Sequence, residues 1–112
     1  MWNTPTEEEL AKIPKLYETE NIPLKDKIIH LHFFIGGCDW YIAEYSPEKD
    51  LFWGYAILNG DTENAEWGYI SFKELRELVV GPGIEVDRDL HWEPRSVIEI
   101  PKIKLRKDKK EY

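Results

Sequence analysis

The sequence predicts a single α+β domain, in which an antiparallel sheet of about four strands packs against one main helix, with a short helix near the N-terminus. Two observations predict this fold. Apolar or alternating stretches follow one another between residues 27 and 70, separated by Gly-Gly, Ser-Pro and Asn-Gly turn signals. A helix-start signature precedes them and another follows them. The length of 112 residues fits one domain with one modest core.

The first expected element is a short helix that begins near Thr4. Thr4 can cap the helix, Pro5 suits the first helical position, and Glu7 stands three residues after the cap. Pro14 ends the helix because a proline removes a backbone donor and clashes with the preceding turn. Residues 16–24 are expected to form an irregular, extended connector.

Four strands are expected next, at residues 27–35, 38–45, 51–58 and 65–70. If Gly36-Gly37 is a two-residue turn, Ile35 pairs with Cys38 and His32 with Tyr41. One extra turn residue would reverse the faces of the second strand, and the sequence leaves this register open. In the first register, the core side carries Ile29, Leu31, Phe33, Ile35, Trp40 and Ile42. The other face is aromatic and polar, with His30, His32, Phe34, Tyr41 and Tyr45.

The main helix is expected over residues 72–80. Ser71 and Glu74 form a capping-box pattern, and Gly81 followed by Pro82 ends the helix. Its predicted buried side is Phe72, Leu75, Leu78 and Val79. Residues 96–105 are expected to be an edge strand or a short helical turn, because Pro101 excludes a central strand.

Charge divides the chain into an acidic body and a basic tail. Residues 102–112 hold six of the 15 Lys and Arg and two of the 22 Asp and Glu, so the tail carries +4 and residues 1–101 carry −11. We expect one domain over 1–101 and a solvated, flexible tail over 102–112. Phosphates would be repelled by the body, so direct nucleic-acid binding is expected only of the tail.

Composition also excludes several classes of protein. The sequence contains no run of 18 apolar residues, so it predicts no membrane-spanning segment. The acidic N-terminus lacks the apolar segment of a signal peptide. The single cysteine, Cys38, excludes an internal disulfide framework. We therefore expect a cytoplasmic protein that does not contact membranes. The sequence contains no phosphate-binding glycine loop, nucleophile elbow or His-Glu-x-x-His motif.

The candidate metal ligands are His30, His32, Cys38 and His91. His30 and His32 share a strand face, but a two-residue turn at 36–37 points Cys38 to the other face. No metal site or other cofactor is therefore favoured, and half-exposed histidines with a small buried thiol are the simpler interpretation. Aromatic residues on the same face could stack unpaired bases, but the body lacks the Lys and Arg that such binding needs, which favours packing under a loop or helix.

Several short motifs, in order, resemble a family known as domain of unknown function 2958. They cover roughly residues 14–95 and include 16–20 (LYETE), 39–44 (DWYIAE), 52–54 (FWG), 66–75 (EWGYISFKEL) and 86–90 (VDRDL). The resemblance implies a small protein of plasmids, phages and integrative elements, without an established activity or cofactor. Within the motifs, Trp40, Phe52, Tyr69 and Leu75 are predicted to be core, and Gly54 and Gly68 to allow close backbone approach.

The polar residues of the motifs are the candidate site. They would form a buried hydrogen-bond network around Arg88 or line a small pocket: Tyr17, Thr19, Glu20, Glu44, Glu66, Arg88 and Asp89. The leading function is a non-catalytic accessory or interaction module of a mobile genetic element that acts through a protein partner. One alternative is an acidic inhibitor that imitates nucleic acid toward a DNA-binding protein. Another is a small hydrolase that uses Glu20, Glu44 or Asp89 beside Arg88.

Overall fold

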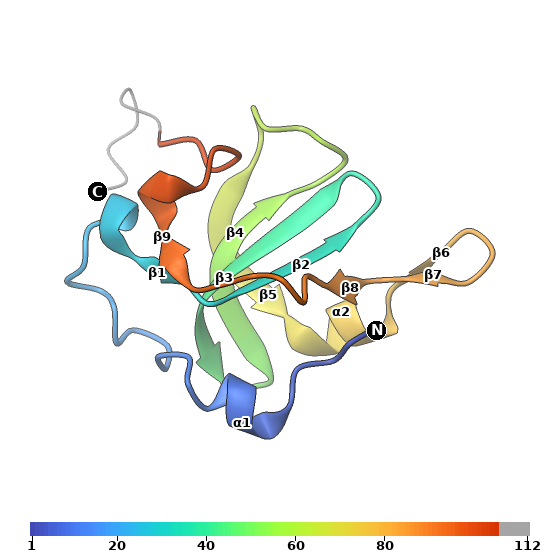
Figure 1. Ribbon diagram of the computed structural model, residues 1–112, viewed down its shortest axis with the longest axis horizontal. Coiled ribbons are helices and arrows are strands. Elements are labelled where there is room, and N and C mark those ends of the chain that lie inside the picture. The colour runs from blue at the N-terminus through green and yellow to red at the C-terminus, as the bar shows by residue number, and fades with distance from the viewer. Residues whose placement is uncertain (106–112) are drawn as a thin grey trace.

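A five-stranded antiparallel sheet forms the centre of the computed structural model, which describes residues 1–105 (Figure 1). Its strand order is β5-β4-β3-β2-β8. The strands span Leu31–Ile35 (β2), Cys38–Ser46 (β3), Leu51–Ile57 (β4), Glu66–Ser71 (β5) and Asp87–Arg88 (β8). The α+β class and the antiparallel sheet are therefore confirmed. The four expected strands are present, and the sheet has a fifth strand, β8, which pairs with β2 at the edge opposite β5.

The remaining elements are short. The α-helices are α1 (Glu7–Leu10) and α2 (Phe72–Glu77), and the 3₁₀ helices are η1 (Leu24–Asp26) and η2 (Val97–Glu99). Two small strand pairs join β1 (Ile28–Ile29) to β9 (Arg95–Ser96) and β6 (Val79–Val80) to β7 (Ile84–Glu85). Since α2 has only six residues, the prediction of one main helix is wrong. No helix within residues 1–105 has the length and apolar character needed to cross a membrane.

Of the two hairpin registers that the sequence left open, the structure has the one with a two-residue turn. Ile35 pairs with Cys38 and His32 with Tyr41, so the Gly-Gly turn has two residues. We call the side that carries Phe33, Trp40 and Phe52 the first face of the sheet. Leu10, Ile13, Phe72, Leu75 and Val86 pack against it. Trp40 and Leu75, both predicted to be core residues, are buried.

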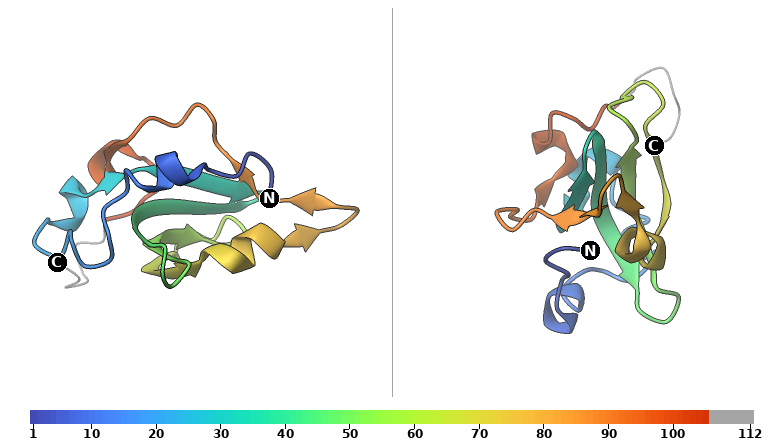
Figure 2. Two further views of the ribbon diagram at one scale, coloured as in Figure 1. Left: turned by 90° about the horizontal axis from the view of Figure 1, so that it is seen from below. Right: turned by 90° about the vertical axis from the view of Figure 1, so that its right-hand side faces the viewer.

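The opposite side, which we call the second face, carries Tyr41, Tyr55 and Ile57. We call residues 89–105 the C-terminal segment. Three of its side chains pack against the second face: Val97, Ile100 and Ile103. Figure 2 shows α2 and the C-terminal segment on opposite sides of the sheet. The sheet is therefore buried on both sides. The aromatic face lies under a peptide segment, as the sequence favoured.

A bulge in β3 changes which side chains face which side. Ile42 pairs with Gly54 and Glu44 pairs with Trp53, which leaves Ala43 as the extra residue. Gly54 makes the bulge possible, because a Cβ there would lie 2.0 Å from the carbonyl oxygen of Tyr41. The prediction of close approach at Gly54 is confirmed. At Gly68, by contrast, a Cβ would meet nothing within 4 Å, so that prediction is wrong.

The bulge also explains why Tyr45 lies on a different face from the one expected. Tyr45 follows the bulge and packs on the first face, beside Phe52 and Phe72. Ile29 was expected on the first face, but it belongs to the second core, because the strand is interrupted at His30, between β1 and β2. Tyr69 was predicted to be core and is instead 55% exposed on the edge strand β5.

The first helix begins two residues later than predicted. Thr6 is the N-cap and accepts the Glu9 N–H at 3.1 Å, while the Glu9 carboxylate accepts the Thr6 N–H at 2.9 Å. The same capping-box spacing occurs twice, at Thr4 with Glu7 and at Thr6 with Glu9, and the structure forms the second. Pro5 is buried just before the helix.

The second helix ends earlier than predicted, at Glu77. Ser71 caps it by accepting the Glu74 N–H at 3.1 Å, as expected. Leu78 then turns to an extended backbone, and Val79 and Val80 pair with Glu85 and Ile84. Gly81-Pro82-Gly83 is therefore the turn of a hairpin that projects from the body, in orange in Figure 1. The predicted burial of Leu78 and Val79 is wrong, because β-branched valines favour the extended strand over another helical turn.

The C-terminal segment contains both of the elements left open by the sequence. Arg95–Ser96 pairs with β1, and Val97–Glu99 forms a helical turn. Part of the predicted tail packs on the body, since Ile103 is buried in the second core. The rest of the predicted tail, residues 106–112, lies outside the described residues.

Candidate functional site

Four of the seven predicted site residues lie together on the second face: Tyr17, Thr19, Glu20 and Glu44. The buried Glu44 carboxylate accepts the Tyr17 N–H at 2.9 Å with one oxygen, and the Thr19 N–H at 3.1 Å and the Thr19 hydroxyl with the other. The bulge at Ala43 places Glu44 beside Trp53. A buried carboxylate therefore holds residues 17–19 against the sheet by three hydrogen bonds.

Lys27 completes this cluster. Its ammonium group donates to the Thr19 carbonyl and, at 3.0 Å, to the Thr19 hydroxyl, and it lies 5.4 Å from the centre of a Trp53 ring. Burial lowers the pKa of Lys27 below its ordinary value, while the carboxylates of Glu44 and Glu20 act in the opposite direction. Lys27 thus provides a positive charge close to the Glu44 carboxylate inside the fold.

A groove of about 640 Å³ opens beside this cluster. Its lining combines apolar and aromatic side chains with a few charged and amide groups, from Tyr17, Glu20, Asn21, Ile22, Pro23, Leu24, Lys27, Glu44 and Trp53. The Tyr17 hydroxyl is hydrogen bonded to that of Tyr69 on the edge strand. Tyr17 has a φ of 72°, a left-handed conformation that is uncommon for tyrosine and that the Glu44 hydrogen bond holds in place.

The two carboxylates in the groove have different chemical possibilities. Both oxygens of Glu44 already accept hydrogen bonds from residues 17–19, which commits this group to holding the loop. The carboxylate of Glu20 makes no hydrogen bond or ion pair with any residue in the range 1–105, and Glu20 lines the groove together with the aromatic residues Tyr17 and Trp53. The groove is thus suited to receive a cation with an apolar stem.

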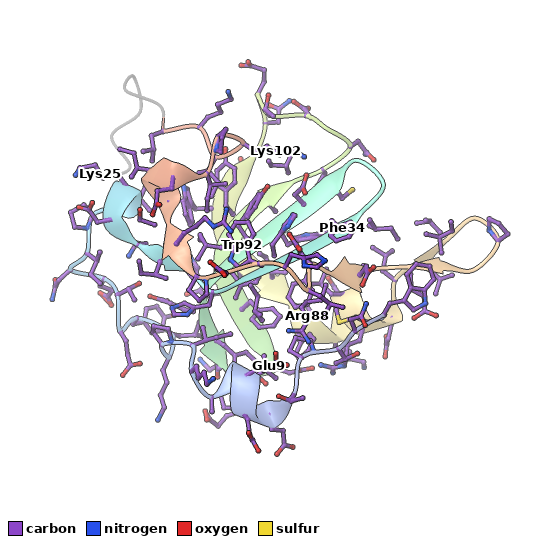
Figure 3. The ribbon with its side chains drawn as sticks, viewed as in Figure 1. Glu9, Lys25, Phe34, Arg88, Trp92 and Lys102 are labelled. Carbon is purple, nitrogen blue, oxygen red and sulfur yellow. The ribbon has the colours of Figure 1, made fainter. Side chains whose placement is uncertain are left out.

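Arg88 lies elsewhere, on the opposite edge of the sheet. Its guanidinium group forms two hydrogen bonds to the Glu9 carboxylate, at 2.8 and 3.2 Å, and one to the Asn3 carbonyl at 3.0 Å. Figure 3 shows Arg88 and Glu9 facing one another between β8 and α1. This contact, together with the Thr6 N–H, lowers the pKa of Glu9 to about 2. Arg88 ties α1 to the sheet, and the structure does not gather the seven candidate residues around it.

Asp89 belongs to a third cluster. His32 lies between two carboxylates, with Nε2 at 2.7 Å from Asp39 and Nδ1 at 3.3 Å from Asp89. Its ring stacks on Tyr41 at 4.6 Å, and Lys102 reaches Asp39 at 3.1 Å. Burial, with help from the two aspartates, raises the pKa of Tyr41. Because Asp89 and Lys102 belong to the C-terminal segment, this cluster fastens that segment to the second face.

The last candidate, Glu66, is exposed at the start of β5 and lies outside the groove lining. Within residues 1–105, no three His, Cys, Asp or Glu side chains converge in a way that could hold a metal ion. Cys38 packs at the first face and accepts the Asn59 N–H at 3.4 Å, whereas His32 lies on the second face. Burial lowers the pKa of His30, and His91 is exposed.

Two residues of the groove were not singled out by the sequence. Lys27 stands between a polar connector and an apolar strand, where a lysine usually marks a solvated strand end. Trp53 was assigned only to the third strand, without a role. The signal that could have identified them is the bulge, because Gly54 next to Trp53 indicates an irregular strand pairing.

The fold and the groove together define a small α+β domain whose sheet is buried on both faces and whose second face carries a preformed groove. The model of a family described as a protein of unknown function, DUF2958, matches residues 7–101. The chain therefore belongs to the DUF2958 family, as its motifs indicated. No curated protein and no solved structure matches the chain.

Proposed function

We propose that the chain is a non-catalytic interaction module of a mobile genetic element, acting in the cytoplasm through a protein partner, and that the groove receives a basic side chain of that partner. The observation that carries the proposal is that Glu20 lines the groove with Tyr17 and Trp53 and that its carboxylate has no hydrogen-bond or ion-pair partner within residues 1–105. The link to mobile elements and the compartment are expectations from the sequence, and the groove supplies the binding chemistry.

The lining favours a cation with an apolar stem. The methylenes of an arginine or lysine can lie along Tyr17 and Trp53, while the charged end pairs with Glu20. Lys27 does not compete for Glu20 by a direct contact, because its ammonium group is turned toward Thr19. The formal charge of −11 on residues 1–101 would also attract a basic partner at long range.

The groove is held open before any partner arrives. Glu44 and Lys27 fix residues 17–19 by hydrogen bonds that are shielded from water. A preformed groove binds more tightly than a mobile one, because less conformational freedom is lost on binding. This rigidity is what an interaction site needs, and it supports a binding role for the cluster.

The two alternatives have less support. A nucleic-acid mimic presents its carboxylates to a partner, whereas Glu9, Asp39 and Asp50 are paired with cationic side chains of the chain itself. A hydrolase of the kind expected needs Arg88 beside Glu20, Glu44 or Asp89. Arg88 instead binds Glu9, and both oxygens of Glu44 are occupied.

The test compares tagged proteins in cells of the native host. Wild-type protein and an Ile98→Lys control, changed at an exposed residue outside the groove lining, should retain the same partner. Glu20→Lys should lose it, because the new charge repels a basic side chain. With the isolated partner, Glu20→Gln should weaken binding by about tenfold to a hundredfold, as loss of a charge-assisted pair does. Equal retention and equal affinity of all variants would contradict the proposal.

A further inference from the structure

One edge of the sheet is covered by another segment of the chain, and the other edge is not paired within residues 1–105. At the β8 edge, Trp2 forms a parallel β-bridge with Asp87. The Trp2 N–H donates to the Val86 carbonyl at 2.8 Å, and the Arg88 N–H donates to the Trp2 carbonyl at 3.3 Å. At the other edge, β5 has six residues, and no strand in the described part of the chain pairs with its outer side. A long uncovered edge is a template for pairing with another strand.

Two aromatic residues flank Gly68 at the centre of β5. Trp67 precedes it and Tyr69 follows it, and both rings lie on the second face because they pair with Tyr55 and Trp53. We propose that β5 pairs with β5 of a second copy of this chain, antiparallel, around a two-fold axis at Gly68. The sheet then runs continuously through both copies. This inference does not rest on the proposed function.

The symmetric register places compatible residues opposite one another. Gly68 faces Gly68 of the second copy, and Trp67 of each copy faces Tyr69 of the other. Cross-strand aromatic pairs stabilise antiparallel strands, and here the same pair forms twice. Glu66 faces Ile70, so the two Glu66 carboxylates do not oppose each other.

Within residues 1–105, no contact or backbone angle requires a glycine at position 68. Its φ is not positive, and an added Cβ would meet nothing within 4 Å. Gly54, directly opposite on β4, is required by the bulge, whereas Gly68 is not. The missing side chain at the centre of this uncovered strand leaves space above the first face, where the helix that follows β5 in the second copy would lie.

The first face offers that room. A groove of about 620 Å³ lies between α2 and the end of β4, and Ala56 and Leu58 line it beside the first half of β5. The two-fold axis brings α2 of the second copy to this half, because α2 follows β5 directly. The groove therefore lies where the second copy's helix approaches.

Electrostatics gives the dimer a recognisable salt dependence. Each copy has a formal charge of −7, and Glu74 and Glu77 line the groove near the contact. Salt screens this repulsion, so the dimer should tighten as the salt concentration rises. An interface held together by charge pairs would show the opposite trend.

The experiment is sedimentation equilibrium of the full chain at low and high salt, with charge variants at the axis. Wild type and the exposed-site control Ile98→Lys should form dimers. Gly68→Lys and Gly68→Glu should each weaken dimerisation by about tenfold or more, since like charges then face each other across the axis. An equimolar mixture of the two variants should recover a mixed dimer.

This recovery is specific to the register, because only residues that face each other at the axis can compensate in this way. Near-wild-type unfolding curves of both variants would show that they fold, as the open space around Gly68 leads us to expect. Monomeric wild-type protein, unweakened Gly68 variants, or a mixture without recovery would each overturn the proposal. A monomer that nevertheless binds the partner through Glu20 would leave the proposed function standing.

Discussion

The two faces of the sheet are covered in different ways. The first face is aliphatic and phenylalanine-rich, and helix α2 and residues near α1 pack on it. The second face also has an aliphatic core, but it adds two buried tyrosines, partly buried tryptophans and buried charged groups, and irregular segments cover it. The first face is held mainly by apolar burial, whereas the second depends on specific hydrogen bonds from Glu44, Lys27 and Asp39. The groove that we propose as a binding site lies on the face whose cover is polar and irregular.

The largest expected effect is at the bulge that separates the two faces. Gly54→Val should destabilise the protein by more than about 4 kcal/mol, because its Cβ would collide with the Tyr41 carbonyl and the strand pairing must shift. Urea unfolding followed by fluorescence measures this. The matched change on the neighbouring strand, Gly68→Ala, should stay within about 0.5 kcal/mol of wild type. Equal effects of the two changes would contradict the assignment of the bulge to Gly54.

The next effect concerns the anchor of the second face. Glu44→Gln should cost about 2 kcal/mol, because one oxygen becomes an amide donor that faces the N–H groups of the loop. Hydrogen exchange should rise in residues 17–19 more than in β2. If exchange of the loop is unchanged, Glu44 does not hold it.

A smaller effect of opposite sign is expected at Tyr55, also on the second face. Its hydroxyl is buried and has no hydrogen-bond partner among residues 1–105. Tyr55→Phe should therefore leave stability unchanged or raise it by up to about 1 kcal/mol, since a buried polar group without a partner is costly. Thermal unfolding of the two proteins decides this, and a clear loss of stability would reveal a partner for the hydroxyl.

The smallest effect concerns the ion pair that ties α1 to the sheet. The pKa of Glu9 is held at about 2, below its ordinary value of 4.5, so its contribution is complete above pH 4.5 and is lost as the pH falls toward 2. Because Glu9 is partly exposed, Glu9→Gln should cost less than about 1 kcal/mol at neutral pH. The difference from wild type should vanish in acid-denaturation curves near pH 2.

The sequence predicted the first face better than the second. Alternation from Leu31 to Ile42 marks the core side chains of the hairpin, the two-residue Gly-Gly turn is one of the two registers that the sequence allowed, and Ser71 marks the helix start. Val79 and Val80, expected in the helix, form a strand instead, because two β-branched residues before a Gly-Pro-Gly turn favour a hairpin. Local patterns thus sufficed where burial follows a simple period.

The groove could be predicted only in part. The motif residues Tyr17, Thr19, Glu20 and Glu44 were selected together, but nothing local shows that a loop crosses the sheet to meet Glu44. Arg88 and Asp89 stand in one motif, yet their side chains point to separate clusters, as neighbours on an extended strand usually do. Pairings between distant segments decide such sites, and one sequence contains no direct record of them.

The stacked rings of Trp53 and Trp67 have a practical consequence. Their centres lie 5.1 Å apart with planes 20° from parallel, and they come from paired strands β4 and β5. Indole chromophores this close couple their electronic transitions, so the circular dichroism spectrum should contain a two-signed band from this pair. Its loss during unfolding would time the separation of these two strands alone, without any attached dye.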